Sequence, residues 1–310
     1  GQLVESIGNS EPIGNSKSIG NSVYTSKMRI NMSYPLECEP YYIPFSYITP
    51  LSHKYIRNHS DIPEVGNSQI AIYYNDIFLD NIDMDSIQHC NRTDFYNTLQ
   101  CCGNRIDEKQ ALKKFNNYDI SSKGMIYNSL FSGYSLECLA KPILLKNYNR
   151  IGDINHIQFE GSDLYKISVP ITYLDNVYIV DKMDGDYLDK EHGGPLRTIV
   201  KGTVGCRNVK WINTIRLSSE EADSPWQQNY YRHNGKAINE YPINTIITSH
   251  NNKDYVYNRK KITVKGVAYS LNGISSVKVF YDGKWNNAKV HSDNNIYSWN
   301  LWEIDLDIND

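Results

Sequence analysis

The sequence predicts an α+β protein in two unlike parts, a mixed α/β domain followed by a small β-sandwich. In the first part, short apolar stretches alternate with polar, loop-like segments. After Pro242 the sequence consists of short predicted strands, in which apolar and polar residues alternate, separated by turn residues. With 310 residues, 40% of them hydrophobic, the chain can bury one large core and one smaller core.

The N-terminal segment is repetitive. Ile-Gly-Asn-Ser begins at Ile7, Ile13 and Ile19, and three such turns are too few for a solenoid. We therefore predict a flexible, low-complexity tail there. The predicted organisation is a tail at 1–34, the mixed domain at 35–237 and the sandwich at 238–310.

Within the mixed domain, Gln69–Tyr74 and Asn176–Val180 are predicted strands, because each is a short run of apolar and β-forming residues. Asp107–Phe115 is a predicted helix. The motifs described below lie between such elements, in loops, where binding and catalytic residues are concentrated.

The second part contains at least four predicted strands, with the Asp282-Gly283 turn between two of them. Alternation at this spacing predicts a sandwich of immunoglobulin (Ig) type. Too few strands are visible for seven, so we expect the sandwich to be incomplete. The predicted strands are Thr245–Ser249, Lys261–Tyr269, Val277–Tyr281 and Tyr297–Trp302.

Charge and cysteine content exclude several classes of protein. The net charge is -3, which argues against a general nucleic-acid or anionic-membrane binder. None of the six cysteines lies in a CxxC pair, so a zinc ribbon is not expected. No secretory signal or membrane-spanning apolar run is visible, which favours a soluble protein in a reducing compartment over a disulfide framework.

Two motifs in the first half could bind an anion or a soft metal. Cys101 and Cys102 are adjacent, and in an extended segment only one of them can face a given site. A thiolate suits a soft metal centre, and nearby Arg105 could lower its pKa; the alternative is a buried structural cysteine. Arg57 and His59 alternate and suit a phosphate or oxyanion, although a solvated turn also fits.

Two further motifs follow. Glu191–Arg197 contains a Gly-Gly-Pro turn that would let the backbone approach a ligand closely. With Val204–Trp211 it forms a basic cluster, for which a solvated charged loop is the alternative. Glu220–Tyr231 is rich in aromatic residues and could equally be a core patch. The basic residues are His192, Arg197, Arg207 and Lys210.

Together these segments resemble the sulfite oxidase family, over roughly residues 35–305. Four motifs occur in the family's order and approximate spacing: Arg-Asn-His, Leu-Gln-Cys-x-Gly-Asn-Arg, His-Gly-x-Pro-x-Arg and Val-Lys-Trp. Ile262–Ser270 and Trp299–Trp302 resemble its C-terminal dimerisation domain. Assimilatory nitrate reductases share this molybdenum domain.

The resemblance implies a molybdenum–molybdopterin cofactor and assigns roles position by position. Cys101 matches the metal's thiolate ligand, Arg57 also matches a sulfite-binding arginine, and Tyr231 matches the tyrosine near the metal. Asp163 matches a pterin contact in an uncertain register. The matched pterin contacts are Tyr55, Arg57, Asn58, His59, Asp163, His192, Arg197, Asn208, Val209 and Lys210.

The implied reaction is oxygen-atom transfer that converts sulfite to sulfate. Its two electrons leave one at a time, to an acceptor such as a haem protein or oxygen, and the implied assembly is a homodimer. The alternatives are a nitrate reductase-like domain and a degenerate, non-catalytic pterin-binding protein.

The sequence also departs from the family. Ile106 stands where the family has a second substrate arginine, and the sandwich stops before a further anion-binding arginine. We therefore expect weakened sulfite binding. Animal relatives are mitochondrial and plant relatives peroxisomal. The final Ile-Asn-Asp is not a peroxisomal signal, so we expect a soluble intracellular protein, with a mitochondrial location left open.

Overall fold

The computed structural model describes residues 29–31, 36–38, 40–66, 69–105, 124–248 and 261–307. The predicted helix at Asp107–Phe115 and the departure at Ile106 lie outside these ranges, as does most of the predicted tail. Arg29–Asn31, at the end of that tail, form the short strand β1, which pairs with β2 (Glu37–Cys38).

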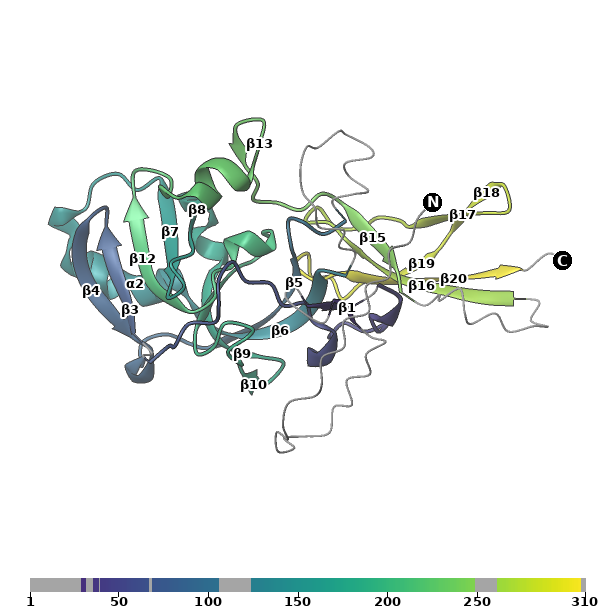
Figure 1. Cartoon of the computed structure of the whole chain (residues 1–310), viewed down its shortest axis with the longest axis horizontal. Coiled ribbons are helices and arrows are strands. Elements are labelled where there is room, and N and C mark those ends of the chain that lie inside the picture. Colours follow the sequence, from purple (N-terminus) through teal and green to yellow (C-terminus); the bar gives the residue numbers. More distant parts are fainter. Residues whose placement is uncertain are drawn as a thin grey trace, which may run out of the picture.

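Among the described residues, two five-stranded sheets and helix α2 build the larger part, on the left and centre of Figure 1. The described residues are therefore mostly β-structure, with fewer helices than the predicted mixed texture implies. The first sheet has the order β4 (Ile77–Asp83), β3 (Gln69–Tyr74), β12 (Ile212–Ser218), β7 (His156–Gly161), β8 (Lys166–Pro170). The second has the order β10 (Asp186–Tyr187), β9 (Val177–Met183), β6 (Ile126–Ser135), β5 (Thr93–Gln100), and β11 (Arg197–Val200) also pairs with β9.

The predicted strand at Gln69–Tyr74 is confirmed as β3. Its Ile70 and Ile72 are fully buried, as the period-two alternation of a strand requires. The strand predicted at Asn176 begins one residue later, as β9. β3 pairs in parallel with β12, and β12 pairs antiparallel with β7, so the sheet is mixed.

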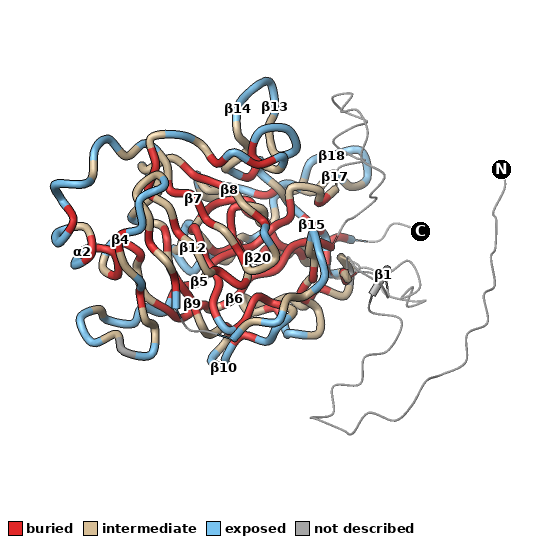
Figure 2. Tube along the Cα trace, turned by 60° about the vertical axis from the view of Figure 1, so that its left-hand side comes forward, coloured by how far each residue is buried: buried red, intermediate tan, exposed pale blue. Residues whose placement is uncertain are grey.

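Helix α2 (Leu136–Lys146) completes the larger core. The Ser135 hydroxyl accepts a hydrogen bond from the Cys138 amide and caps the helix N-terminus. Its buried residues recur at helical spacing, so one face packs onto both sheets. Those buried residues are Leu136, Leu139, Ala140 and Ile143. Figure 2 shows the buried strands running through the molecule beneath exposed loops.

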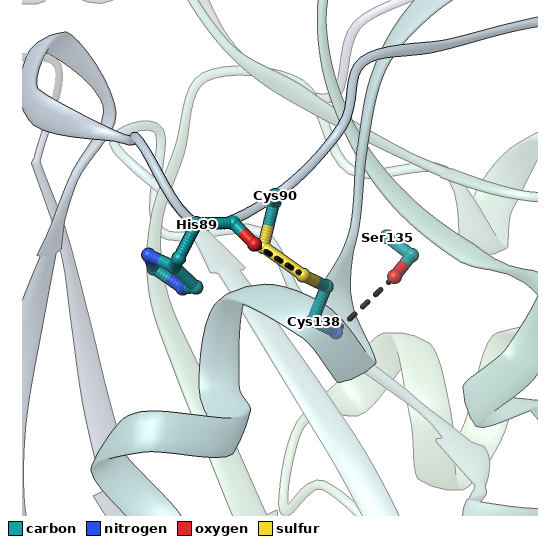
Figure 3. Close-up of a disulfide and its surroundings, with 4 residues drawn as sticks. All are labelled: His89, Cys90, Ser135 and Cys138. Carbon is teal, nitrogen blue, oxygen red and sulfur yellow. Dashed lines mark hydrogen bonds between the residues drawn. A yellow bond between two sulfur atoms is a disulfide. The ribbon is translucent and has the colours of Figure 1, made fainter.

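A disulfide joins α2 to the loop that precedes β5 (Figure 3). Cys90 and Cys138 are bonded, with Cα atoms 5.9 Å apart. Cys138 Sγ also lies 3.6 Å from the His89 carbonyl oxygen, which is a contact only, since a disulfide sulfur carries no proton to donate. The sequence favoured a reducing compartment over a disulfide framework, and this bonded pair differs from that expectation. The sequence offered no signal for the pairing, because only the tertiary structure brings the two residues together.

The C-terminal part is a separate sheet on the right of Figure 1. Its order is β15 (Asn244–Ile247), β16 (Lys261–Tyr269), β20 (Asn300–Asp307), β19 (Lys289–His291), with a hairpin of β17 (Lys278–Tyr281) and β18 (Lys284–Asn287). Asp282 and Gly283 both have positive φ, at 49° and 73°, as a tight hairpin turn requires. The incomplete Ig-type sandwich stays a prediction.

The predicted strand at Tyr297 begins three residues late, at Asn300, because the residues before it bind the larger part instead. The Tyr297 carbonyl accepts a hydrogen bond from the Thr98 amide (2.7 Å), and Trp299 Nε1 donates to the Ser46 carbonyl (3.0 Å). These bonds fix the C-terminal sheet beside β5, the strand that leads to Cys101.

Short elements complete the chain. β13 (Arg232–His233) and β14 (Lys236–Ala237) form a small hairpin, and Trp226–Tyr230 form the π-helical turn η7. The 3-10 turns are η1 (Pro40–Tyr42), η2 (Leu51–His53), η3 (Met84–Ser86), η4 (Tyr148–Arg150), η5 (Ile171–Asn176) and η6 (Gly205–Arg207). Among the described residues, we find no helix with the length and apolar character needed to cross a bilayer.

Candidate functional site

A pocket opens where the two five-stranded sheets meet, and it gathers nearly all the residues predicted for the site. It takes side chains from the loop before β3, the end of β5, the β7–β8 turn, β11, the segment around η6 and the residue after η7. The predicted residues that line it are Tyr55, Arg57, Asn58, His59, Cys101, Asp163, Arg197, Asn208, Val209, Lys210 and Tyr231.

The two adjacent cysteines lie differently, as the alternation of an extended chain predicts. Cys101 is buried and lines the pocket at the end of β5, held by a 3.0 Å hydrogen bond from its amide to the Met125 carbonyl. Cys102 does not line the pocket and packs against the core beneath the C-terminal sheet. Of the two, only Cys101 is placed to meet a ligand in the pocket.

The motif's arginine binds the C-terminal sheet. Arg105 donates hydrogen bonds to Asn244 Oδ1 (2.8 Å) and to the Thr245 carbonyl (2.7 Å), both in β15. The predicted effect of Arg105 on the Cys101 thiol stays a prediction. The side chain links the end of β5 to the C-terminal sheet.

Three cations give the pocket a positive interior. Arg197 donates to the His192 carbonyl (2.8 Å), and Lys210 donates to Asn58 Oδ1 (2.7 Å) and to the Glu191 carbonyl (2.5 Å). Burial, and then the charge of Arg197, lower the pKa of Lys210 to about 7. A bound anion would relieve this repulsion and favour the ammonium form. The third cation is Arg57.

Each of the two guanidinium groups has a buried N–H donor that makes no hydrogen bond. Arg57 Nη1 and Arg197 Nε are buried, and neither has a hydrogen-bond partner. Buried donors without partners are costly, so a ligand with several acceptor oxygens is the expected complement. A phosphate group has such oxygens and a negative charge, and the pocket is thus suited to a phosphate-bearing cofactor.

His192 lies behind the lining, not in it, which differs from the prediction. It is buried, its Nδ1 is 2.8 Å from Asp189 Oδ1, and its Nε2 has no partner. Burial lowers the pKa of His192, with Asp189 opposing the shift. A neutral ring that donates from Nδ1 to Asp189 leaves Nε2 as an unused acceptor.

The Gly-Gly-Pro turn packs closely against the side chain of Lys210. A Cβ on Gly193, whose φ is +103°, would lie 2.9 Å from Cβ and Cγ of Lys210. Asn208 is also structural, since its side chain donates to the Val204 carbonyl (2.9 Å) and accepts from the Val200 amide (2.8 Å). Both features hold Lys210 and its neighbours in place.

An aromatic wall carries Tyr231. Its hydroxyl is 2.8 Å from His59 Nε2, and the His59 ring stacks on Tyr165 at 4.8 Å between centroids. Burial raises the pKa of Tyr231 and, with Arg57 nearby, lowers the pKa of His59 to about 4. Both groups are therefore neutral near pH 7, so the phenol keeps its proton and remains a donor.

The prediction missed several lining residues. Tyr127 comes from β6 and Tyr165 from the turn after β7, and neither lies in a motif with a recognisable signal. Gly205, Cys206 and Trp211 lie within the basic segment but were not assigned to the site.

Comparison with known proteins identifies the family. An oxidoreductase molybdopterin binding domain model matches residues 79–226, and a Mo-co oxidoreductase dimerisation domain model matches residues 235–310. Sulfite oxidase of Arabidopsis thaliana is 28% identical over 91% of this chain and 83% of its own length. The chain belongs to the sulfite oxidase family of molybdopterin oxidoreductases. Its cofactor is Mo-molybdopterin, which the thiol, the cationic interior and the unpartnered donors fit.

Two further relatives are much longer than this chain, and one solved structure shares its fold. Mitochondrial sulfite oxidase of Drosophila melanogaster is 28% identical over 85% of this chain, which spans only 51% of that relative. A nitrate reductase [NADH] of Brassica napus is 23% identical over 92% of this chain and 37% of its own length. The sulfane dehydrogenase SoxCD of Paracoccus pantotrophus has a TM-score of 0.73 at 21% identity, covering 94% of this chain and 81% of its own, so it shares the fold.

Proposed function

We propose that this molybdopterin oxidoreductase converts sulfite to sulfate by oxygen-atom transfer. The observation that carries the proposal is the pocket itself, where the Cys101 thiol, the Tyr231 phenol and the unpartnered Arg57 Nη1 meet. Sulfite is a small oxyanion, and a buried guanidinium donor is the partner it needs. The sulfite oxidases among the relatives support the same substrate.

The residues divide into three roles. Cys101 supplies the thiolate ligand of the metal, and when bound the molybdenum centre supplies oxygen-atom transfer and accepts two electrons. Arg57 holds the anion, and Tyr231, kept protonated by burial, donates a hydrogen bond near the reacting atoms. The pterin contacts are Tyr55, Arg57, Asn58, His59, Asp163, His192, Arg197, Asn208, Val209 and Lys210, of which His192 would act from behind the lining.

The cysteine assignment and the activity are tested together. Cys101→Ser should lose bound molybdenum, the thiolate-to-metal absorption band and sulfite-dependent reduction of an artificial acceptor. Cys102→Ser is the matched control, because Cys102 does not line the pocket, and this variant should keep all three. Loss of the band in Cys102→Ser but not in Cys101→Ser would reverse the assignment.

The same assay separates the alternatives. Nitrate turnover with a viologen donor and no sulfite turnover would favour the nitrate reductase-like function that the Brassica relative suggests. A chain that binds molybdenum and pterin but turns over neither anion would be a non-catalytic binding protein.

We further propose that sulfite binding is weak. Ile106 offers no donor where the family has its second arginine, so the anion would be desolvated without compensation. Ile106→Arg should recover on the order of 1–3 kcal/mol, roughly 10- to 100-fold in kcat/KM, in steady-state kinetics at matched molybdenum content. A wild-type chain as efficient as intact relatives would contradict this.

The assembly and acceptor complete the proposal. The match to a dimerisation domain supports a homodimer formed through residues 235–310. The electrons pass to a one-electron acceptor such as a haem protein, or to oxygen. The name of the Drosophila relative favours a mitochondrial location.

A further inference from the structure

Two cysteines beside the pocket are close enough to react with one another. Cys102 Sγ and Cys206 Sγ are 3.3 Å apart, at hydrogen-bonding distance, and form no disulfide, although 104 residues separate them in the chain. We propose that Cys102 and Cys206 are a reversible dithiol that oxidation closes into a disulfide, locking together the two loops on either side of the metal-binding cysteine.

The geometry favours this pairing. A disulfide bond is about 2.05 Å long, so the sulfurs must approach by a little over 1 Å. Cys102 lies in the turn that follows β5, and Cys206 lies in η6, so neither is inside a long element that would resist the shift. Both are only partly buried, and a small oxidant can therefore reach them.

Other pairings are disfavoured. Cys101 is buried and faces the pocket, while its neighbour Cys102 faces the core beneath the C-terminal sheet. Cys38 is also buried. The remaining two cysteines already form the disulfide beside α2 (Figure 3).

A low-molecular-weight disulfide such as glutathione disulfide is a sufficient oxidant. The thiolate of one cysteine attacks a sulfur of glutathione disulfide, forms a mixed disulfide and releases one glutathione thiol. The second cysteine then displaces the other glutathione. One protein S–S bond replaces two S–H bonds, and the two electrons and two protons end on two molecules of reduced glutathione.

The bridge would act on the pocket because one of its ends lines the pocket and the other is next to a lining residue. Cys102 follows Cys101 directly. Cys206 itself lines the pocket, and its carbonyl accepts a 2.9 Å hydrogen bond from the hydroxyl of Tyr165, the ring that stacks on His59. Joining these two segments should slow the escape of bound pterin.

The test uses the full chain with its cofactor. The protein is reduced, freed of reductant and incubated with glutathione disulfide, and its remaining thiols are then alkylated. Peptide mapping should find Cys102 linked to Cys206, reversibly with dithiothreitol. The Cys90–Cys138 link in the same sample proves that oxidation occurred. Cys102→Ser and Cys206→Ser are matched controls, and each should give a glutathione adduct on the remaining cysteine and no cross-link.

Three results would overturn the proposal. The first is that both thiols remain alkylated while Cys90–Cys138 is bonded. The second is that only glutathione adducts form in the wild type, or that Cys101 is the partner of Cys206. The third concerns the effect of the disulfide on pterin escape. After gel filtration, the pterin that stays bound is measured by its fluorescence, and more should remain in the oxidised wild type than in oxidised Cys102→Ser. Equal amounts would refute the proposal.

Discussion

Single residues in the pocket show how burial sets charge. Lys210 has an ordinary pKa of 10.5, which burial and Arg197 lower to about 7 in the folded protein. Its ammonium is therefore costly unless an anion is present. The same burial keeps Tyr231 protonated and His59 neutral, so the pocket concentrates its charge on Arg57 and Arg197.

The Lys210 shift predicts a pH dependence of stability. Between about pH 7 and 10.5 the unfolded chain holds a proton that the folded chain has released, so the free energy of unfolding rises with pH. From pH 7 to pH 9, cofactor-free wild type should gain on the order of 1–2 kcal/mol relative to Lys210→Met. Urea denaturation measures this, and equal pH profiles for the two proteins would count against the shift.

Cofactor binding supplies a control for this effect. A bound phosphate favours the ammonium form of Lys210. In the cofactor-loaded wild type, the free energy of unfolding should therefore no longer rise between pH 7 and pH 9 relative to Lys210→Met.

At the scale of elements, one buried arginine holds the segment that carries Tyr231. Arg207 is fully buried and donates to Gln227 Oε1 (2.5 Å), to the Ile238 carbonyl (2.9 Å) and to the Tyr231 carbonyl (3.2 Å). It thereby joins η6, η7 and the chain after β14. The sequence placed Arg207 in a basic cluster, and in the structure its donors bind protein oxygens.

Arg207→Met should destabilise the protein by about 3–5 kcal/mol in urea denaturation, because several buried acceptors lose their donor. Arg207→Lys should also be destabilising, since one ammonium cannot reproduce the planar fork. Lys146→Met removes an exposed cation paired with Asp80 and should change stability by about 0.5 kcal/mol or less. An Arg207→Met variant as stable as Lys146→Met would refute the bracing role.

At the scale of the whole molecule, the C-terminal sheet and the cofactor domain share a seam. Trp299 is fully buried there, Arg105 crosses it to β15, and the Asn244 side chain donates to Gln100 Oε1 at 2.9 Å. Since Gln100 precedes Cys101, the seam also positions the end of β5 that leads into the pocket.

We therefore expect the chain to unfold as one unit. Trp299→Ala should cost about 3–5 kcal/mol and lower a single calorimetric transition, because the cavity lies on the shared seam. Trp285→Ala, in the exposed β17–β18 hairpin, should change stability by about 0.5 kcal/mol or less. Two separate transitions in the wild type would show that the parts are independent.

Much of this protein was determined by local sequence. Alternation placed β3 and β16, and Asp282-Gly283 placed a hairpin turn, because side-chain direction and turn geometry depend on near neighbours. The eleven predicted residues that line one pocket came from the resemblance of the motifs to the sulfite oxidase family. The tertiary structure decided which distant residues meet: Cys90 with Cys138, Cys102 with Cys206, Arg105 with β15, and Tyr127 and Tyr165 with the pocket. Such contacts depend on how sheets pack across many intervening residues, and no local pattern records that packing.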